Sequence, residues 1–445
     1  MNDSGPNKKP RPTIIPRPSH NVSRDNISRA ALKVLYRLHK SGYQAFLVGG
    51  GVRDALLGLH PKDFDIATDA HPEEIRALFS NCRLIGRRFR LAHIRFGREI
   101  IEVATFRAAT DGSEEHGDVE HDREGRILRD NVYGTIDEDV WRRDFTCNAL
   151  YYNIADFSIW DYAGGAKDVE QRRLVLIGDP GRRLREDPVR MLRAVRFAAK
   201  LDFSIDDAVQ ASIEQHHELL VNVPSARLFD EFLKMFQAGH AQPTFELLRR
   251  FDLFRMLFPE TDEYLNNDED NLRFTRLALD NTDSRVQAGK SVTPMFLLGV
   301  FFWAPVKERA SALRAKEKMS VAQSLSLASY ELAGLQQTRI SIPKRFTIPM
   351  REMLSMQPRF ENRRGRRALK LLEHPRFRAS YDFMMLRAEC GEFDADLAQF
   401  WTDVQQQGPD ERLESFGVQQ QPGQKKAGRR KRRPRRRRNP GAEEK

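Results

Sequence analysis

The chain has few cysteines and no long apolar run, and both shortages narrow the classes of protein that it can be. Its 445 residues include three cysteines, Cys82, Cys147 and Cys390, which are widely separated. They form neither a zinc-binding spacing nor a disulfide framework, so we expect a protein of a reducing, cytoplasmic compartment. The longest apolar run, residues 295–304, is too short to cross a bilayer, and we expect no membrane insertion.

The N-terminal segment lacks the apolar core of a secretory signal. It is polar and rich in proline, and we expect residues 1–24 to be a disordered leader. The chain also lacks the G-x-x-x-x-G-K-[ST] phosphate-binding loop, which excludes the P-loop class of nucleotide enzymes.

Acidic residues are absent from the most basic segment of the chain. Residues 425–438, KKAGRRKRRPRRRR, hold eleven Lys and Arg, and the remainder is balanced at 63 basic and 63 acidic residues. So many like charges with almost nothing apolar cannot fold alone, so we expect residues 405–445 to be a disordered linker and basic tail. The tail is predicted to bind nucleic-acid phosphates without regard to base sequence. A solubility or targeting role is the alternative.

Among the residues that are present, the most informative segment is FLVGGGVRDALLGLHPKDFDIATDA, residues 46–70. A short apolar run ends at Gly49 and Gly50, and helical composition follows over residues 52–57. Backbone N–H groups at a glycine turn that runs into a helix form a natural site for anions. This pattern predicts a phosphate-binding turn.

Two aspartates follow the turn within the same segment. Asp63 and Asp65 flank Phe64, so in an extended strand both carboxylates leave the same face. Paired carboxylates repel each other unless a cation lies between them, and Mg²⁺ prefers such oxygen ligands together with substrate phosphates. The two features together suggest phosphoryl or nucleotidyl transfer.

Four motifs in this order resemble a known family. GGGVRD, DFDIAT, RRDFTCNALYY at 142–152 and REDPVRMLRAVRFAAKL at 185–201 are similar to the signatures of class II nucleotidyltransferases of the polymerase beta superfamily. These enzymes are the bacterial poly(A) polymerases and the CCA-adding tRNA nucleotidyltransferases. The resemblance covers roughly residues 25–260 and implies transfer of a nucleotide from an NTP to an RNA 3′ end, with release of pyrophosphate.

The resemblance implies a catalytic centre of carboxylates. Asp63 and Asp65 would bind two metal ions, Mg²⁺ or alternatively Mn²⁺. A third carboxylate would complete the centre, and Asp144 in the RRDF motif is our first choice. Glu102, on an expected neighbouring strand, is the competitor, and a structural salt bridge is the alternative role for Asp144.

Further residues are expected to hold the nucleotide. Gly49, Gly50 and Arg53 would bind the triphosphate, with Arg143 as a second clamp. The alternative for Arg53 is a solvated residue paired with Asp54.

The segment from residue 185 resembles the base-reading motif of the family. It implies that Asp187 accepts from the amino group of adenine and that Arg190 donates to its ring nitrogen. Asp followed by Pro is also a common start of a helix, so Asp187 could simply cap it. Arg193 and Arg196 lie on the same sector of that helix as Arg190, which could be a solvated basic face.

The order of patterns predicts an α+β protein, with a small mixed-sheet head followed by helices. We expect a helix over 26–42, strands over 99–106 and 147–155, and a mobile loop over 108–130. The expected domains are a leader (1–24), a catalytic nucleotidyltransferase head (25–165), a helical neck that binds the base and RNA (166–260), an arginine-rich helical body (261–404) and the tail (405–445).

Within the family, three features favour the poly(A) polymerase branch. These are LIGRRFRLAHI at 84–94, the segment 371–387 and the basic tail. The resemblance then implies ATP and RNA 3′ ends as partners, with RNA-decay or RNA-chaperone proteins as further ones. A CCA-adding enzyme is the alternative, although the H-D phosphohydrolase signature of one bifunctional form is missing. A third possibility is an inactive RNA-binding protein, which the intact aspartate pair argues against.

Overall fold

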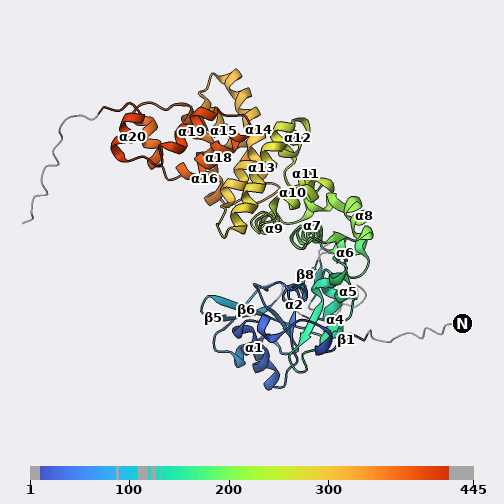
Figure 1. Cartoon of the computed structure of the whole chain (residues 1–445). Coiled ribbons are helices and arrows are strands. Elements are labelled where there is room, and N and C mark those ends of the chain that lie inside the picture. Colours follow the sequence, from blue (N-terminus) through green and yellow to red (C-terminus); the bar gives the residue numbers. More distant parts are fainter. Residues whose placement is uncertain (1–10, 87–89, 109–118, 122–126, 131, 420–445) are drawn as a thin grey trace, which may run out of the picture. The chain divides into compact units, whose positions relative to one another are not determined.

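The computed structural model describes residues 11–86, 90–108, 119–121, 127–130 and 132–419. The chain divides into two compact units, residues 1–355 and 356–445. Figure 1 follows the chain from the sheet-containing N-terminal part, in blue, to the helices, in green through red. The expected α+β class, a mixed-sheet head followed by helices, is confirmed.

The head is built on one eight-stranded mixed sheet. Only β3 and β6 pair in parallel among the neighbours in this sheet, and the others are antiparallel. In sheet order the strands are β1 (Thr13–Ile15), β10 (Ile159–Asp161), β9 (Leu150–Asn153), β2 (Ala45–Val48), β3 (Asp65–Thr68), β6 (Glu99–Thr105), β5 (Leu91–Phe96) and β4 (Cys82–Ile85).

The head consists of this sheet, an apolar cluster on one of its faces, and several helices. One side of the sheet contributes Phe46, Val48, Ala67 and Tyr151 to a single apolar cluster. The helices of the head are α1 (Arg29–Lys40), α2 (Gly50–Leu56), α3 (Pro72–Leu78), α4 (Ile136–Asp139) and α5 (Gly165–Glu170). The expected helix over 26–42 is therefore present over a shorter range. It begins where the Ser28 hydroxyl accepts from the N–H of Ala31, a helix-capping bond.

The N-terminal leader is partly ordered, so our expectation of disorder over 1–24 is wrong for its second half. β1 pairs with β10 at the edge of the sheet, with Ile14 opposite Trp160. The backbone of β1 forms hydrogen bonds with β10, and the two isoleucines of the strand favour the extended conformation. The composition of the segment does not reveal this pairing. Residues 1–10 lie outside the described residues.

The expected loop over 108–130 also contains secondary structure. β7 (Val119–His121) and β8 (Ile127–Asp130) form an antiparallel pair. The other residues from 109 to 126 lie outside the described part of the chain. A further two-stranded parallel pair, β11 (Arg173–Leu174) with β12 (Ser204–Ile205), follows the head.

The remainder of the first unit is helical. Its helices are α6 (Pro180–Glu186), α7 (Val189–Leu201), α8 (Asp207–His216), α9 (Ser225–Phe236), α10 (Ala241–Arg250), α11 (Leu253–Leu257), α12 (Pro259–Asn267), α13 (Glu269–Gln287), α14 (Pro294–Glu317), α15 (Val321–Gln336) and α16 (Lys344–Ser355). Their core is a group of packed phenylalanines around Phe301. No helix in the described residues is long and apolar enough to cross a membrane.

The second unit is a small helical domain with its own core. Its helices are α17 (Gly365–Leu369), α18 (Phe377–Glu389), α19 (Ala395–Asp403) and α20 (Pro409–Ser415). Short 3₁₀ helices also occur along the chain, over Arg17–Ser19, Arg24–Asn26, Val140–Arg142, Thr146–Asn148, His217–Asn222, Gln357–Glu361 and Lys370–Glu373. The indole N–H of the buried Trp401 donates to the carbonyl of Phe360 at 2.7 Å.

The linker that we expected to begin at residue 405 starts later. Phe416 is fully buried in the core of the second unit, and its carbonyl accepts from the N–H of Gly365 at 2.7 Å. The glutamine-rich composition of this segment does not indicate an ordered helix. One buried aromatic side chain is nevertheless enough to hold a short helix against the core. The basic residues 425–438 lie outside the described residues. The chain divides after Ser355, whereas our expected helical domains divided after residues 260 and 404.

Candidate active site

The glycine turn lies directly beside one of the predicted aspartates. β2 ends at Val48, Gly49 takes a φ of 76°, and α2 begins at Gly50, earlier than the expected residue 52. A Cβ atom added to Gly49 would lie 3.9 Å from Oδ2 of Asp65. Glycine is needed here for its positive φ, which strains other residues, whereas 3.9 Å is an ordinary contact distance that would admit a Cβ atom.

Three side chains form a row across neighbouring strands. Asp65 on β3 is paired with Glu102 on β6, and Glu102 is paired with His93 on β5. Residues paired in this way lie on the same face of a sheet, on strands about 4.8 Å apart. Nε2 of His93 lies 3.1 Å from Oε1 of Glu102. The structure therefore brings a second carboxylate next to Asp65.

The environment of Asp65 disfavours its charge. Although the side chain reaches solvent, protein atoms around the carboxylate exclude part of the water. This burial, followed by the repulsion of Glu102 and then Asp63, raises the pKa of Asp65 to about 6, against an opposing effect of Arg143. A divalent cation would relieve this repulsion, so the donor set suits Mg²⁺.

Asp63 is close enough to influence Asp65 but does not lie on its strand. β3 begins at Asp65, so the expected single strand carrying both aspartates is wrong at Asp63, which is exposed in the preceding loop. Within the described residues, no group of three or more Asp, Glu, His or Cys side chains is arranged to hold a metal alone. A metal bound here would share its ligands with the substrate phosphates.

Asp144 occupies a different environment, deep between the head and α7. Its Oδ2 accepts from Arg193 at 2.7 Å, and its Oδ1 accepts from the backbone N–H of Phe145 at 2.8 Å. Burial alone would raise the pKa of Asp144, but Arg193 and these hydrogen bonds outweigh it and hold the pKa below its usual value. The geometry favours the structural salt bridge over our first choice of Asp144 as the third catalytic carboxylate.

Arg53 is neither solvated nor free to clamp a phosphate. Its side chain is 2% exposed, its Nη1 donates to Asn148 at 2.5 Å, and its Nε and Nη2 donate to Asp54. Its guanidinium also packs over the ring of Phe197 on α7 at 5.2 Å. Arg53 therefore lies behind the glycine turn and joins α2 to α7. The expected pairing with Asp54 is present, but the side chain is buried and not solvated.

Arg143 lies nearer to the carboxylates. Its Nε donates to the hydroxyl of Tyr151 at 2.6 Å, and its Nη2 donates to Asp139 at 2.9 Å. The guanidinium is partly exposed and acts on Asp65 electrostatically. Of the two predicted clamps, Arg143 is the one whose position suits a phosphate.

The two expected base-reading residues lie where α6 meets α7. Asp187 accepts from the N–H of Val189 only at 3.3 Å, which is a weak cap, whereas Arg227 donates to both of its oxygens at 2.8 and 2.7 Å. Nη1 of Arg190 donates to the carbonyl of Arg183 at 2.6 Å. Sequence reasoning missed Arg227, which lies 40 residues away and has no motif of its own.

The remaining arginines of α7 are not a solvated face. Arg193 holds Asp144, and Arg196 lies 3.6 Å from the buried carboxylate of Glu231. Both guanidinium groups pack over Phe197, as Arg53 does. Arg53, Arg193 and Arg196 surround the ring of Phe197 and so connect the head to the helices that follow. The spacing of Arg193 and Arg196 in the sequence indicated a shared helix face but not these contacts.

Part of the segment that favoured one branch of the family cannot be placed. The residues Arg87, Arg88 and Phe89 of the GRRF motif lie outside the described residues. The strands on either side, β4 and β5, form an antiparallel hairpin that ends next to the carboxylate row.

Family models match three successive regions of the chain. Their descriptions are "Poly A polymerase head domain" for residues 45–175, "Probable RNA and SrmB- binding site of polymerase A" for residues 202–265, and "Polymerase A arginine-rich C-terminus" for residues 317–439.

Curated relatives match most of the length. The chain is 47% identical to poly(A) polymerase I of Salmonella typhi over 409 residues, which cover 91% of this chain and 88% of the relative. It is 43% identical to poly(A) polymerase I of Haemophilus influenzae over 92% of this chain and 91% of the relative. A CCA-adding enzyme of Lactobacillus helveticus is 36% identical, over 49% of this chain and 52% of the relative.

Solved structures share the fold at lower identity. A tRNA-processing enzyme in its apo form is 18% identical with a TM-score of 0.58, over 86% of this chain and 99% of that one. The Thermotoga maritima CCA-adding enzyme complexed with tRNA is 18% identical with a TM-score of 0.54, over 90% of this chain and 94% of that one. These likenesses establish the architecture.

Proposed function

Because the chain belongs to the bacterial poly(A) polymerase I family, we infer that it adds AMP from ATP to RNA 3′ ends and releases pyrophosphate. The identity of 47% over 91% of the chain carries this conclusion. The match to the CCA-adding relative is shorter and covers 49% of this chain. The nucleotidyltransferase activity is thus assigned to the site around Asp65.

Asp63 and Asp65 are proposed to hold Mg²⁺ together with the substrate phosphates, with Glu102 as a neighbouring carboxylate. The raised pKa of Asp65 supports this assignment, because burial and then the charges of Glu102 and Asp63 disfavour its ionised form, and a cation would offset these effects. Bound metal ions would lower the pKa of the attacking 3′-hydroxyl and neutralise charge on the phosphates. The residues themselves fix where that chemistry occurs, and His93 orients Glu102 from the next strand.

The nucleotide is proposed to lie between the turn and α7. The backbone N–H of Gly50 suits a phosphate oxygen, and that of Gly49, which donates to the carbonyl of Leu150 only at 3.4 Å, could join it. Arg143 adds a cation beside them. Arg190 would donate to the adenine ring. Since both oxygens of Asp187 already accept from Arg227, we propose that this pair shapes the base pocket as a unit.

The function is tested by incubating the purified protein with a generic RNA, Mg²⁺ and each NTP separately. We expect long tails with ATP and little extension with CTP. The same assay with tRNA lacking its CCA end separates the alternatives. Addition that stops after a CCA triplet would establish a CCA-adding enzyme, and no addition to either RNA would leave an inactive RNA-binding protein.

A further inference from the structure

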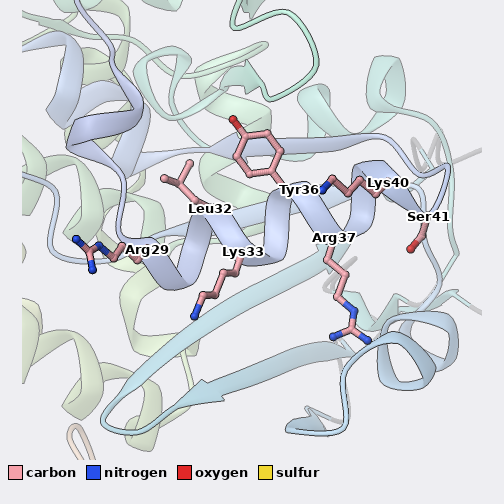
Figure 2. Close-up of a pocket in the computed structure, with 7 residues that line it drawn as sticks. All are labelled: Arg29, Leu32, Lys33, Tyr36, Arg37, Lys40 and Ser41. Carbon is pink, nitrogen blue, oxygen red and sulfur yellow. The ribbon is translucent and has the colours of Figure 1, made fainter.

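Helix α1 presents a cationic outer face. Its inner face is buried through Ala31, Val34, Leu35 and Leu38, which have almost no exposed surface. The outer face carries the exposed cations Arg29, Lys33, Arg37 and Lys40. Figure 2 shows Lys33 and Arg37 extending from the same side of the helix. The helix contains no acidic residue.

This arrangement of charge works against the stability of the helix. Arg29 is the first residue of α1, where the helix dipole disfavours a cation, and no acidic residue is present in the first turn. Arg29 with Lys33, and Lys33 with Arg37, are like charges four residues apart, which also repel. The cations of the last turn favour the helix, so stability can explain Arg37 and Lys40 but leaves Arg29 and Lys33 unexplained.

No neighbouring charge offsets the repulsion. Within the described part of the chain, none of these four cations forms an ion pair with a carboxylate, unlike exposed arginines such as Arg172, Arg276 and Arg309. The rest of the protein without its basic tail is balanced in charge, so this face is a local exception. A polyanion is the partner that such a face fits.

The side chains of this face form a groove, and two of them are held by contacts with neighbouring residues. Its side chains line a shallow groove of about 530 Å³, together with Leu32, Tyr36 and Ser41. The guanidinium of Arg37 packs over the ring of Phe79 at 5.1 Å, and the hydroxyl of Tyr36 accepts from Arg24 at 3.1 Å. Cationic grooves that contain aromatic side chains are typical of surfaces that bind single-stranded nucleic acid. The cations run for about 16 Å along the helix axis.

The groove lies on the opposite face of the sheet from the catalytic carboxylates. Tyr151 packs in the apolar cluster on the Asp65 side, and its neighbour Tyr152 must point to the other side. α1 packs against β2, β3 and β6, and none of its buried residues belongs to the apolar cluster on the Asp65 side, so α1 covers the other side. RNA bound at α1 therefore cannot be the reacting 3′ end.

We propose that the basic face of α1 is a second RNA-binding surface, which holds phosphates of an RNA strand at a distance from its reacting 3′ end. RNA is favoured over an acidic protein because the groove combines cations with an aromatic side chain. This role rests on the proposed function, in which RNA is the substrate. It would keep a long product on the enzyme between additions.

The test replaces three cations that have no ion-pair partner, as Arg29→Gln, Lys33→Gln and Lys40→Gln together in the full chain. Binding of a long single-stranded RNA is measured against salt concentration, with thermal unfolding and extension of a short primer at saturation. We expect the slope of log affinity against log salt to flatten by about 2, since each lost phosphate contact removes about 0.7. The melting temperature should stay equal or rise, because like-charge repulsion is removed.

The matched control is the triple variant Arg172→Gln, Arg276→Gln and Arg309→Gln, which loses the same net charge from residues in ion pairs. It should leave the salt slope unchanged. An equal flattening in both variants would overturn the proposal, as would an unchanged slope in the α1 variant. Competition by poly-glutamate as strong as that by RNA would also overturn it, in favour of an acidic protein. If the wild type extends the short primer, these failures concern α1 alone and not the proposed function.

Discussion

Two carboxylates of the head, Asp65 and Asp144, have opposite surroundings. Burial of Asp65, and then the charges of Glu102 and Asp63, raise its pKa to about 6. Asp144 accepts from Arg193 and from a backbone N–H, and its pKa is lowered. A site that needs a cation leaves its carboxylates repelling one another, whereas a structural carboxylate has its own cation. The partners of an aspartate therefore reveal its role better than its place in a motif.

The largest effect should come from removing the repelling carboxylate. In Asp65→Asn we expect nucleotide addition to fall by about three orders of magnitude or more, because the metal and the phosphates lose a shared ligand. Turnover with saturating ATP and primer measures this loss. Glu99→Gln, an exposed residue on the same sheet, is the control and should keep full activity. Near-normal turnover in Asp65→Asn would contradict the proposed centre.

Removing the charge of Asp144, which is already paired with Arg193, should instead lower the stability of the fold. Asp144→Asn leaves Arg193 partly buried without its partner, and we expect a loss of about 2 kcal/mol in the free energy of unfolding. Turnover per folded molecule should stay within about tenfold of the wild type. Denaturant unfolding of Asp144→Asn, Arg193→Gln and the double variant measures the coupling. A collapse of turnover in a fully folded Asp144→Asn would restore Asp144 as the third catalytic carboxylate.

A smaller change is expected in the base pocket. If Asp187 and Arg227 act as a unit, Asp187→Ala and Arg227→Gln should each reduce the preference for ATP over CTP by about tenfold. The double variant should lose no more than either single one. Selectivity constants with each nucleotide measure the preference. A simple cap at Asp187 would instead give a stability loss of about 1 kcal/mol with unchanged preference.

The smallest effect is a pH dependence of stability. The folded pKa of Asp65 lies above its unfolded value, so its contribution is fully present below pH about 4 and is lost as the pH rises through about 6. The wild type should therefore gain stability relative to Asp65→Asn as the pH falls between these values. Asp144 has the opposite sign, and its contribution is lost only as the pH falls through its lowered pKa. Parallel unfolding curves for the wild type and Asp65→Asn across this range would contradict the raised pKa.

Local patterns in the sequence predicted much of the head. The turn at Gly49 and the adjacent Asp65 lie within one strand–turn–helix–strand segment, so their spacing alone indicates a phosphate and metal site. Helical periodicity also predicted α1, although over a longer range than the observed Arg29–Lys40.

Contacts between distant residues could not be predicted in the same way. Only the sheet register sets Glu102 opposite Asp65, and only the packing of α7 on the head pairs Asp144 with Arg193. The packing of α9 beside α7 pairs Asp187 with Arg227. The same holds for β1, which needs β10 to form, and for Phe416, which needs the core around Trp401.

The sequence by itself determined the class of chemistry, the α+β order of elements and the basic tail, because each is written in neighbouring residues or in composition. The tertiary structure alone decided which carboxylates share a face of the sheet and which arginines are buried in contacts between elements. It also decided that the cations of α1 lie on the opposite side from the catalytic carboxylates. The physical reason is that charge and burial depend on partners brought together by folding, while periodicity and turn chemistry act within a few residues.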